Sequence, residues 1–251
     1  GVAILDLNSN ESVVINGEEH FPMQSVFKFP IALKVLNDVD NDKIKLRDSI
    51  FISSAELKKK TWSPIQEKYP NGNIKMALSD IIYYMVALSD NIGCDVILKN
   101  NGGASSVNNY LRSIGIENMT IKINEAEQQA KPDKQFQNWT TPNEAINLLT
   151  MYYKHSLLKP ATHNFLWETM KKTATGSIKN KLPKGIVVIH KTGSAPNIKN
   201  GTAVNNDIGI MMFPHKKAIA YAIFIKDSKE TSDTNYNIIA EIGKIIADYK
   251  K

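Results

Sequence analysis

The sequence predicts a mixed α/β fold, in which an antiparallel five-stranded sheet built from both ends of the chain is flanked by helices and carries an inserted helical lobe. Two observations predict this fold. Short, β-branched segments lie near both ends of the 251-residue chain, and helical spacing of apolar residues dominates the middle. Because the sheet must bury one face against helices, strands at both ends favour one α/β lobe made of residues 1–23 and 170–251. Residues 24–169 then form the helical lobe, with the functional site between the two lobes.

The first elements are a hairpin and a series of helices. Two apolar runs around an Asn/Ser turn in residues 1–17 are typical of a β-hairpin. From about residue 24 the spacing becomes helical, and Pro30 is tolerable there only near a helix start. We expect Ser79 to cap the helix DIIYYMVAL. A helix over about 93–99 should end at a Gly-Gly pair, and the helix VNNYLRSIG should end at the glycine that closes it.

The second half contains a polar loop, a helix, three strands and a final helix. Residues 124–139 lack clean periodicity, and a loop of that length in a compact domain is usually functional or disordered. Pro142 opens the helix NEAINLLTMYYKH. The segments GIVVIHKTG, DIGIMMFP and KAIAYAIFIKD are short and rich in β-branched residues, which indicates strands. The last segment, NYNIIAEIGKIIADY, has the spacing of an amphipathic helix.

Composition excludes several classes of function. The formal net charge is +6, but the lysines are spread along the chain and the only run is Lys58–Lys60, so we expect no nucleic-acid partner. No apolar run is long enough to span a membrane. The single cysteine, Cys94, allows no internal disulfide, and its apolar surroundings favour a buried thiol. The five histidines are scattered singly, so we expect neither a zinc site nor a cofactor.

Three short motifs occur in order along the chain. They are SVFK (Ser25–Lys28), SDN (Ser89–Asn91) and KTG (Lys191–Gly193). Each motif alone is weak, because a Ser-x-x-Lys can be a solvated first turn, an SDN a helix cap and a KTG a strand that runs into a turn. Their order and structural context together favour a shared site.

Ser25 and Lys28 are three residues apart at a predicted helix start, so they share one face. A serine hydroxyl is a poor nucleophile until a neighbouring group takes its proton. A lysine can take it only if burial or other cations lower its pKa. The backbone N–H groups at the helix start can stabilise an oxyanion. This pair therefore indicates nucleophilic catalysis by Ser25 with Lys28 as its base.

The other two motifs indicate proton transfer and substrate binding. Ser89 can relay a proton to a leaving nitrogen, and Asn91 can hold a substrate amide. Lys191 and Thr192 can bind a carboxylate. Gly193, at the end of a strand, allows substrate to approach the edge of the backbone closely.

Taken together, the motifs resemble those of one enzyme family. S-x-x-K with SDN and KTG marks the class A β-lactamases and the penicillin-binding proteins. The chain resembles a class A serine β-lactamase over nearly its whole length, and the resemblance implies the β-lactamase/transpeptidase-like fold. It also implies acylation of Ser25 by a β-lactam, with an oxyanion hole formed by the N–H groups of Ser25 and Ser194. The polar loop should carry the glutamate that activates the deacylating water. Counting back from TTP at residues 140–142 favours Glu125, with Glu127 as the competitor.

Several residues depart from the commonest class A pattern. Gln24 precedes the nucleophile, Asp95 lies four residues after Asn91, and QNW ends the polar loop. Trp62 resembles the aromatic wall of the family's substrate site. These features resemble the class A branch of the Bacteroidota, which includes extended-spectrum cephalosporinases.

Two arginine contacts of the family are missing. No arginine lies near residue 123, and Asn138 takes the position of the partner in the usual loop-closing ion pair, which leaves open what fixes the loop. The arginine beside the KTG strand is absent as well, because Asn206 and Ser177 take its two usual positions. We expect Thr192 and Ser194, with the charge of Lys191, to replace it, with help from Lys179 or Lys181.

The leading interpretation is β-lactam hydrolysis that confers resistance. The alternatives are a D,D-peptidase or penicillin-binding protein, which shares the motifs but deacylates slowly, and a β-lactam sensor domain, which remains acylated. We expect a monomer that acts on small-molecule β-lactams in the periplasm or outside the cell.

Overall fold

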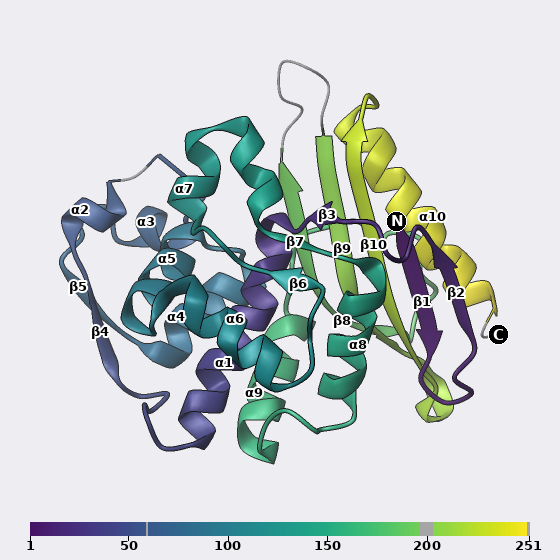
Figure 1. Ribbon diagram of the computed structural model, residues 1–251, viewed down its shortest axis with the longest axis horizontal. Helices are drawn as coiled ribbons and strands as arrows, with labels where there is room; N and C mark the ends of the chain where they lie inside the picture. The colour runs from purple at the N-terminus through teal and green to yellow at the C-terminus, as the bar shows by residue number, and fades with distance from the viewer. Residues whose placement is uncertain (59, 196–202, 250–251) are drawn as a thin grey trace.

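The computed structural model describes residues 1–58, 60–195 and 203–249. Its main sheet has five antiparallel strands in the order β2-β1-β10-β9-β8, which confirms the predicted fold class. Both ends of the chain contribute to this sheet (Figure 1). The strands are β1 (Val2–Asp6), β2 (Ser12–Ile15), β8 (Val187–Ala195), β9 (Ala203–Met212) and β10 (Ala218–Ser228).

Two small sheets lie outside the main one. The three-stranded sheet, in the order β3-β7-β6, joins the segment before Ser25 to both ends of the polar loop region. Its strands are β3 (Phe21–Pro22), β6 (Met119–Thr120) and β7 (Trp139–Thr140). The two-stranded sheet consists of β4 (Ser49–Ile52) and β5 (Ile74–Ala77).

Helices fill the middle of the chain and gather on one side of the main sheet, while the last helix covers the other side (Figure 1). The α-helices are α1 (Lys28–Asp40), α2 (Ser54–Leu57), α3 (Pro64–Lys68), α4 (Leu78–Ala87), α5 (Asn91–Asn100), α6 (Gly103–Ser113), α7 (Glu125–Ala130), α8 (Pro142–Tyr153), α9 (Pro160–Lys171) and α10 (Ser232–Tyr249). The 3-10 helices are η1 (Gln24–Phe27), η2 (Pro132–Gln137) and η3 (Pro214–Lys216).

Alternation along the strands separates two buried layers. In β8, Ile189 belongs to the large core that the helices share with the sheet, whereas Val188 belongs to a smaller core under α10. Ile208 and Met211 of β9 divide in the same way. Because side chains alternate between faces, odd residues of β8 near the site point toward the helices and even residues toward α10. The boundaries 1–23, 24–169 and 170–251 of the two lobes stay a prediction.

Three local expectations need correction. Ser79 does not cap α4, which starts at Leu78, because the backbone N–H groups of Leu78 and Ser79 donate to the carbonyls of Asp48 and Leu46 instead. The helix expected from residue 93 starts at Asn91, because the Asp90 side chain caps it by accepting from the Gly93 N–H. The polar segment 124–139 is no loop throughout, since it contains α7 and η2.

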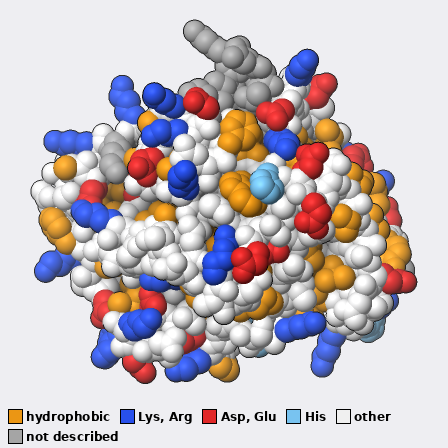
Figure 2. Space-filling model, in the orientation of Figure 1, with side chains coloured by type: hydrophobic (Ala, Val, Ile, Leu, Met, Phe, Trp, Pro, Cys, Tyr) orange, Lys and Arg blue, Asp and Glu red, His pale blue; other side chains and the backbone are white. Residues whose placement is uncertain are grey.

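Two other helix ends agree with the expectations from the sequence. α8 begins at Pro142, with the Thr141 hydroxyl accepting from the Glu144 N–H, and α6 is followed by Gly115 in the left-handed region. Throughout the described ranges, every helix is too short or too polar to cross a bilayer. On the face shown in Figure 2, basic side chains are spread among acidic ones and form no single basic patch.

Candidate active site

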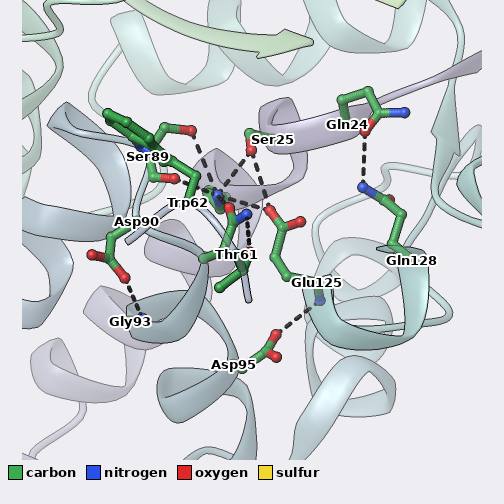
Figure 3. A network of polar contacts seen from close by, with 12 residues as sticks. Gln24, Ser25, Thr61, Trp62, Ser89, Asp90, Gly93, Asp95, Glu125 and Gln128 are labelled. Atoms are coloured by element: carbon green, nitrogen blue, oxygen red, sulfur yellow. Dashed lines mark hydrogen bonds and ion pairs between the residues drawn. The ribbon is translucent and has the colours of Figure 1, made fainter. Parts of the chain in front are cut away.

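Ser25 and Glu125 lie next to one another at the centre of the site (Figure 3), and Lys28 contacts both of them. The Lys28 ammonium lies 2.8 Å from the Ser25 Oγ and 2.8 Å from the Glu125 Oε1. The Ser25 hydroxyl also donates to Glu125 Oε1, at 3.2 Å. Lys28 is fully buried and Glu125 is 3% exposed, so water screens this pair weakly. The Ser25 hydroxyl therefore lies between a buried carboxylate, which can receive its proton, and a buried lysine, which can receive it only as the neutral amine.

The SDN motif surrounds the same lysine. The Lys28 ammonium donates to the Asn91 Oδ1 at 2.5 Å and to the Ser89 carbonyl oxygen at 2.8 Å. The Ser89 Oγ lies 3.5 Å from the same nitrogen. The middle residue, Asp90, has a structural part: it is fully buried, and it accepts from the N–H groups of Gly93 and Ile65. The SDN motif is therefore a helix cap and a site element at once.

Lys191 extends the network from the strand side. Its ammonium donates to the Ser89 Oγ at 3.0 Å and to its neighbour's carbonyl, Thr192 O, at 2.9 Å. Burial lowers the pKa of the Lys191 ammonium well below its ordinary value, and the nearby charge of Lys28 lowers it further. Ser89 thus lies between two lysines, which places its hydroxyl on a direct proton path.

Unusual backbone conformations hold the two serine segments. Gln24, just before the nucleophile, has a φ of 48°, and Ser89 has a φ of 58°. Such left-handed conformations carry a cost for residues other than glycine and are common at functional sites. The hydroxyls of Ser25 and Ser89 both lie within 3.5 Å of the Lys28 nitrogen.

Gly193 packs closely against the segment that carries Ser25. A Cβ atom at this position would lie 2.5 Å from the Met23 carbonyl oxygen and 2.9 Å from the Val26 nitrogen. The missing side chain therefore makes room for the segment that carries Ser25, so that β8 packs directly against it. The expectation that Gly193 also lets substrate approach the strand edge stays a prediction.

The structure places Glu125, not Glu127, at the nucleophile. The Asn124 side chain accepts from the Glu127 N–H, and the Glu127 carboxylate accepts from the Asn124 N–H in return, which is a capping box at the start of α7. Glu127 is exposed, whereas Glu125 one residue into the helix points inward. The geometry thus favours the register counted back from residues 140–142.

The chain lacks the family's usual loop-closing ion pair. Backbone amide groups, the Asn138 side chain and the Asp95 carboxylate hold the polar loop in its place. Asp95 accepts from the Glu125 N–H at 2.8 Å and from the Ala126 N–H at 3.2 Å (Figure 3). Fully buried Asn138 accepts from the Lys122 and Ile123 N–H groups and donates to the Ile123 carbonyl. Asn138 therefore bridges the two ends of the loop without a charge.

Glutamines tie the loop to the nucleophile segment. Gln24 donates to Gln135 at 2.8 Å and accepts from Gln128 at 3.0 Å, and all three side chains are buried. Gln128 also accepts from Asn138 at 3.1 Å. The departure from the family pattern at Gln24 is thus matched by amide partners in the loop.

A cavity of about 480 Å³ opens beside Ser25. Its lining includes Gln24, Ser25, Trp62, Asn91, Glu125 and Ser194. Trp62 is 55% exposed, and its indole N–H donates to the Leu88 carbonyl, so the ring stands at the rim in a fixed orientation. Several predicted site residues therefore line one cavity with Ser25, whereas Thr192 and Gly193 line another.

A second cavity, of about 550 Å³, lies on the other side of β8. Thr192 and Ser194 line it together with Thr175 and Lys181. The hydroxyls of Thr192 and Thr175 lie 2.5 Å apart. Lys181 pairs with Glu241 and Asn237 of α10. This hydroxyl-rich cavity continues the site toward α10.

The residues at the two usual arginine positions have other partners. Asn206 donates to the carbonyls of Pro22 and Met23, and Ser177 donates to the Tyr236 carbonyl. The Lys179 ammonium donates to the Thr173 carbonyl. Arg112 is occupied at the end of α6, where it donates to carbonyls of the 116–119 turn.

Sequence reasoning missed several residues that complete the site. Thr61 accepts from the Asn91 amide at 2.8 Å and from Gln129 of α7, and no motif marked it. Asp95 was noticed only as a departure, although its position one helical turn after Asn91 puts the two on one face of α5. Cys94 is a buried thiol, as expected. In the described part of the chain, no three His, Cys, Asp or Glu side chains are grouped as metal ligands.

Comparison with known proteins agrees with this geometry. The sequence model of the β-lactamase enzyme family matches residues 1–250. The chain is 42% identical over 254 residues to the β-lactamase VEB-1 of Pseudomonas aeruginosa, and this match covers 99% of the chain and 84% of the relative.

Solved structures give the same result. The TLA-3 extended-spectrum β-lactamase superposes with a TM-score of 0.97 at 41% identity, covering 99% of this chain and 92% of that one. A class A representative from Bacteroides cellulosilyticus superposes with a TM-score of 0.93 at 36% identity, covering 99% and 90%. With its whole length matched by the family, the chain belongs to the β-lactamase enzyme family, among the class A serine enzymes.

Proposed function

We propose that this protein hydrolyses the amide bond of penicillins and cephalosporins through an acyl-enzyme on Ser25, and so confers resistance. The observation that carries the proposal is the Ser25 hydroxyl, which lies 2.8 Å from the Lys28 nitrogen and 3.2 Å from a Glu125 oxygen. A nucleophile with a base in hydrogen-bond reach and an orienting third group is the arrangement that nucleophilic catalysis requires.

In acylation, the Ser25 oxygen bonds to the lactam carbonyl carbon, and its proton passes to Lys28 in its neutral amine form, directly or by way of Glu125. The lactam C–N bond then breaks, and the nitrogen takes a proton from the Ser89 hydroxyl. Ser89 regains a proton from the lysines on either side, since the ammonium of Lys191 lies 3.0 Å and that of Lys28 lies 3.5 Å away. The developing oxyanion is stabilised by the N–H groups of Ser25 and Ser194.

In deacylation, Glu125 takes a proton from a water molecule that attacks the ester carbonyl carbon. The bond from that carbon to the Ser25 oxygen then breaks, and the oxygen takes a proton from Lys28, which Glu125 reprotonates in turn. The burial of Glu125 and the hydrogen bonds from its own N–H and that of Ala126 to Asp95 support this role, because they fix the carboxylate in the cavity. A carboxylate positioned to activate water is what distinguishes rapid turnover from a stable acylated state.

The binding roles follow the cavity lining. The Asn91 amide holds the substrate amide, the Trp62 ring packs against the ligand, and Gly193 keeps β8 close to the nucleophile. Thr192 and Ser194, with the charge of Lys191, hold the substrate carboxylate. We further propose that the protein acts as a monomer in the periplasm or outside the cell, with no nucleic-acid partner, and that the site lies between two lobes made of residues 1–23 with 170–251 and of residues 24–169.

Nitrocefin turnover tests this proposal. The unmodified protein should complete many turnovers, whereas a D,D-peptidase would complete few and a sensor domain one. Ser25→Ala should abolish both turnover and covalent labelling by penicillin, measured by mass spectrometry. Labelling of Ser25→Ala would show that another residue is the nucleophile.

A further inference from the structure

A buried polar cluster lies on the α10 face of the main sheet, beside the KTG motif of β8 and outside the catalytic network. It consists of His190, Asp207 and Tyr221, one residue from each of the adjacent strands β8, β9 and β10. Each is at most 1% exposed. The His190 Nδ1 donates to the Asp207 Oδ1 at 2.9 Å, and the Tyr221 hydroxyl donates to the same oxygen at 3.0 Å.

The strands are built to hold this cluster. Gly209 pairs with His190 on one side and with Tyr221 on the other. A Cβ at Gly209 would lie 2.6 Å from the His190 Cβ and 2.8 Å from the Tyr221 hydroxyl, so only a missing side chain leaves the space that the two rings use. Burying a carboxylate carries a desolvation cost that its hydrogen bonds offset only in part. Stability alone is therefore a poor reason for Asp207.

The cluster adjoins the substrate-binding residues. Asp207 is the register partner of Thr192, and both lie on the α10 face of the sheet. A Cβ at Gly176 would meet both the Thr192 Cγ2, at 2.5 Å, and the Asp207 Oδ2, at 2.9 Å, so these two atoms flank the same point. His190 immediately precedes Lys191, whose ammonium reaches Ser89 on the opposite face.

We propose that Asp207, held by His190 and Tyr221, is a positioning residue of this active site: from behind β8 it fixes Thr192 and balances the buried ammonium charge of Lys191. The inference rests on the proposed β-lactam hydrolysis. Asp207 touches no substrate and acts through its two neighbours on β8.

The charges around Lys191 support this role. Burial lowers the pKa of Lys191, and Lys28 adds to that effect, whereas Glu125 on α7, Asp207 and Cys94 act in the opposite direction. Facing Asp207 itself are His190, Tyr221 and Lys179, and the charge of Asp207 also opposes the lowering of the Lys179 pKa by burial. Without the Asp207 charge, Lys191 would lose its proton at lower pH.

The test compares Asp207→Asn with the unmodified protein over the pH profile of kcat/KM for nitrocefin, which carries a carboxylate. Asp207→Asn should move the basic limb to lower pH by about half a unit or more, because an opposite charge is removed from the neighbourhood of Lys191. It should raise KM more than it lowers kcat. Asp38→Asn is the matched control: Asp38 is a buried carboxylate paired with Lys34 at the end of α1, so its loss should lower stability and leave the limb in place.

Tyr221→Phe tests the geometric part separately. It keeps the charge of Asp207 and removes one hydrogen bond, so KM should rise about two- to fivefold while the basic limb stays in place. This variant decides the positioning role even if Asp207→Asn does not fold. An unchanged KM in Tyr221→Phe, or a limb in Asp207→Asn that coincides with the limb of Asp38→Asn, would overturn the inference. Turnover by the unmodified protein tests the proposed function independently of both.

Discussion

Replacing Glu125 by glutamine should separate acylation from deacylation. Glutamine keeps the shape of the side chain but cannot accept a proton from water, and a positioned general base contributes about 10²- to 10⁴-fold. Glu125→Gln should therefore form the acyl-enzyme on Ser25 and release it about 10²- to 10⁴-fold more slowly than the unmodified protein does. The variant also removes the buried partner of Lys28, which should lower the free energy of unfolding by about 3 kcal/mol or less, since Lys28 keeps the Asn91 and Ser89 acceptors.

Glu127→Gln is the matched control, two residues away on the same helix. Its carboxylate is exposed and closes the capping box with Asn124, a position where glutamine also serves. Stability should change by a few tenths of a kcal/mol and turnover should be unaffected. The assay is intact-protein mass spectrometry of each variant after mixing with benzylpenicillin, with stopped-flow release rates. Accumulation in Glu127→Gln but not in Glu125→Gln would refute the assignment.

Three further predictions follow from the site and the core. Thr192→Val should lower kcat/KM about tenfold or more, because a hydrogen bond to a charged group is worth about 1.5–3 kcal/mol. Lys179→Ala and Lys181→Ala should have smaller effects. Unchanged kinetics in Thr192→Val would contradict its role in binding the substrate carboxylate. Burial, and then the charge of His155, lowers the pKa of His163 from 6.5 to about 4. Between these pH values His163 therefore binds more protons in the unfolded chain than in the folded protein. The free energy of unfolding should fall by at most about 3 kcal/mol as the pH drops from 6.5 to 4. Urea titrations should show a weaker pH dependence in His163→Gln, and equal slopes would refute this. A chelator should leave nitrocefin turnover unchanged, whereas a loss restored by zinc would contradict the serine mechanism.

The elements with strong local signals were predictable. The β-branched segments at both ends and the amphipathic C-terminal helix gave the five-stranded sheet and α10, because periodicity along the chain reports which face of an element is buried. The same holds for the start of α8 at Pro142, where a proline and a preceding threonine act within one turn. The expectation that Ser79 caps α4 was wrong, because the carbonyls of residues 46 and 48 accept hydrogen bonds from the backbone N–H groups at the start of that helix.

The candidate catalytic residues were also predictable, since the three motifs are short and ordered. The sequence left Glu125 and Glu127 open, because both lie in one polar segment and either can be a solvated carboxylate. The capping box turns Glu127 outward, and Asp95 holds the start of α7 so that Glu125 points to Ser25.

Motifs and periodicity, which depend on neighbours along the chain, determined the family resemblance, the sheet and the choice of Ser25 as the candidate nucleophile. Contacts between residues about a hundred or more positions apart were decided only by the tertiary structure. These contacts include Lys28 with Glu125, Gln24 with Gln128, and the fit of Gly193 against the Ser25 segment. The physical reason is that hydrogen bonds and close packing between distant segments depend on how the sheet and the helices meet, and no spacing within either segment records that geometry.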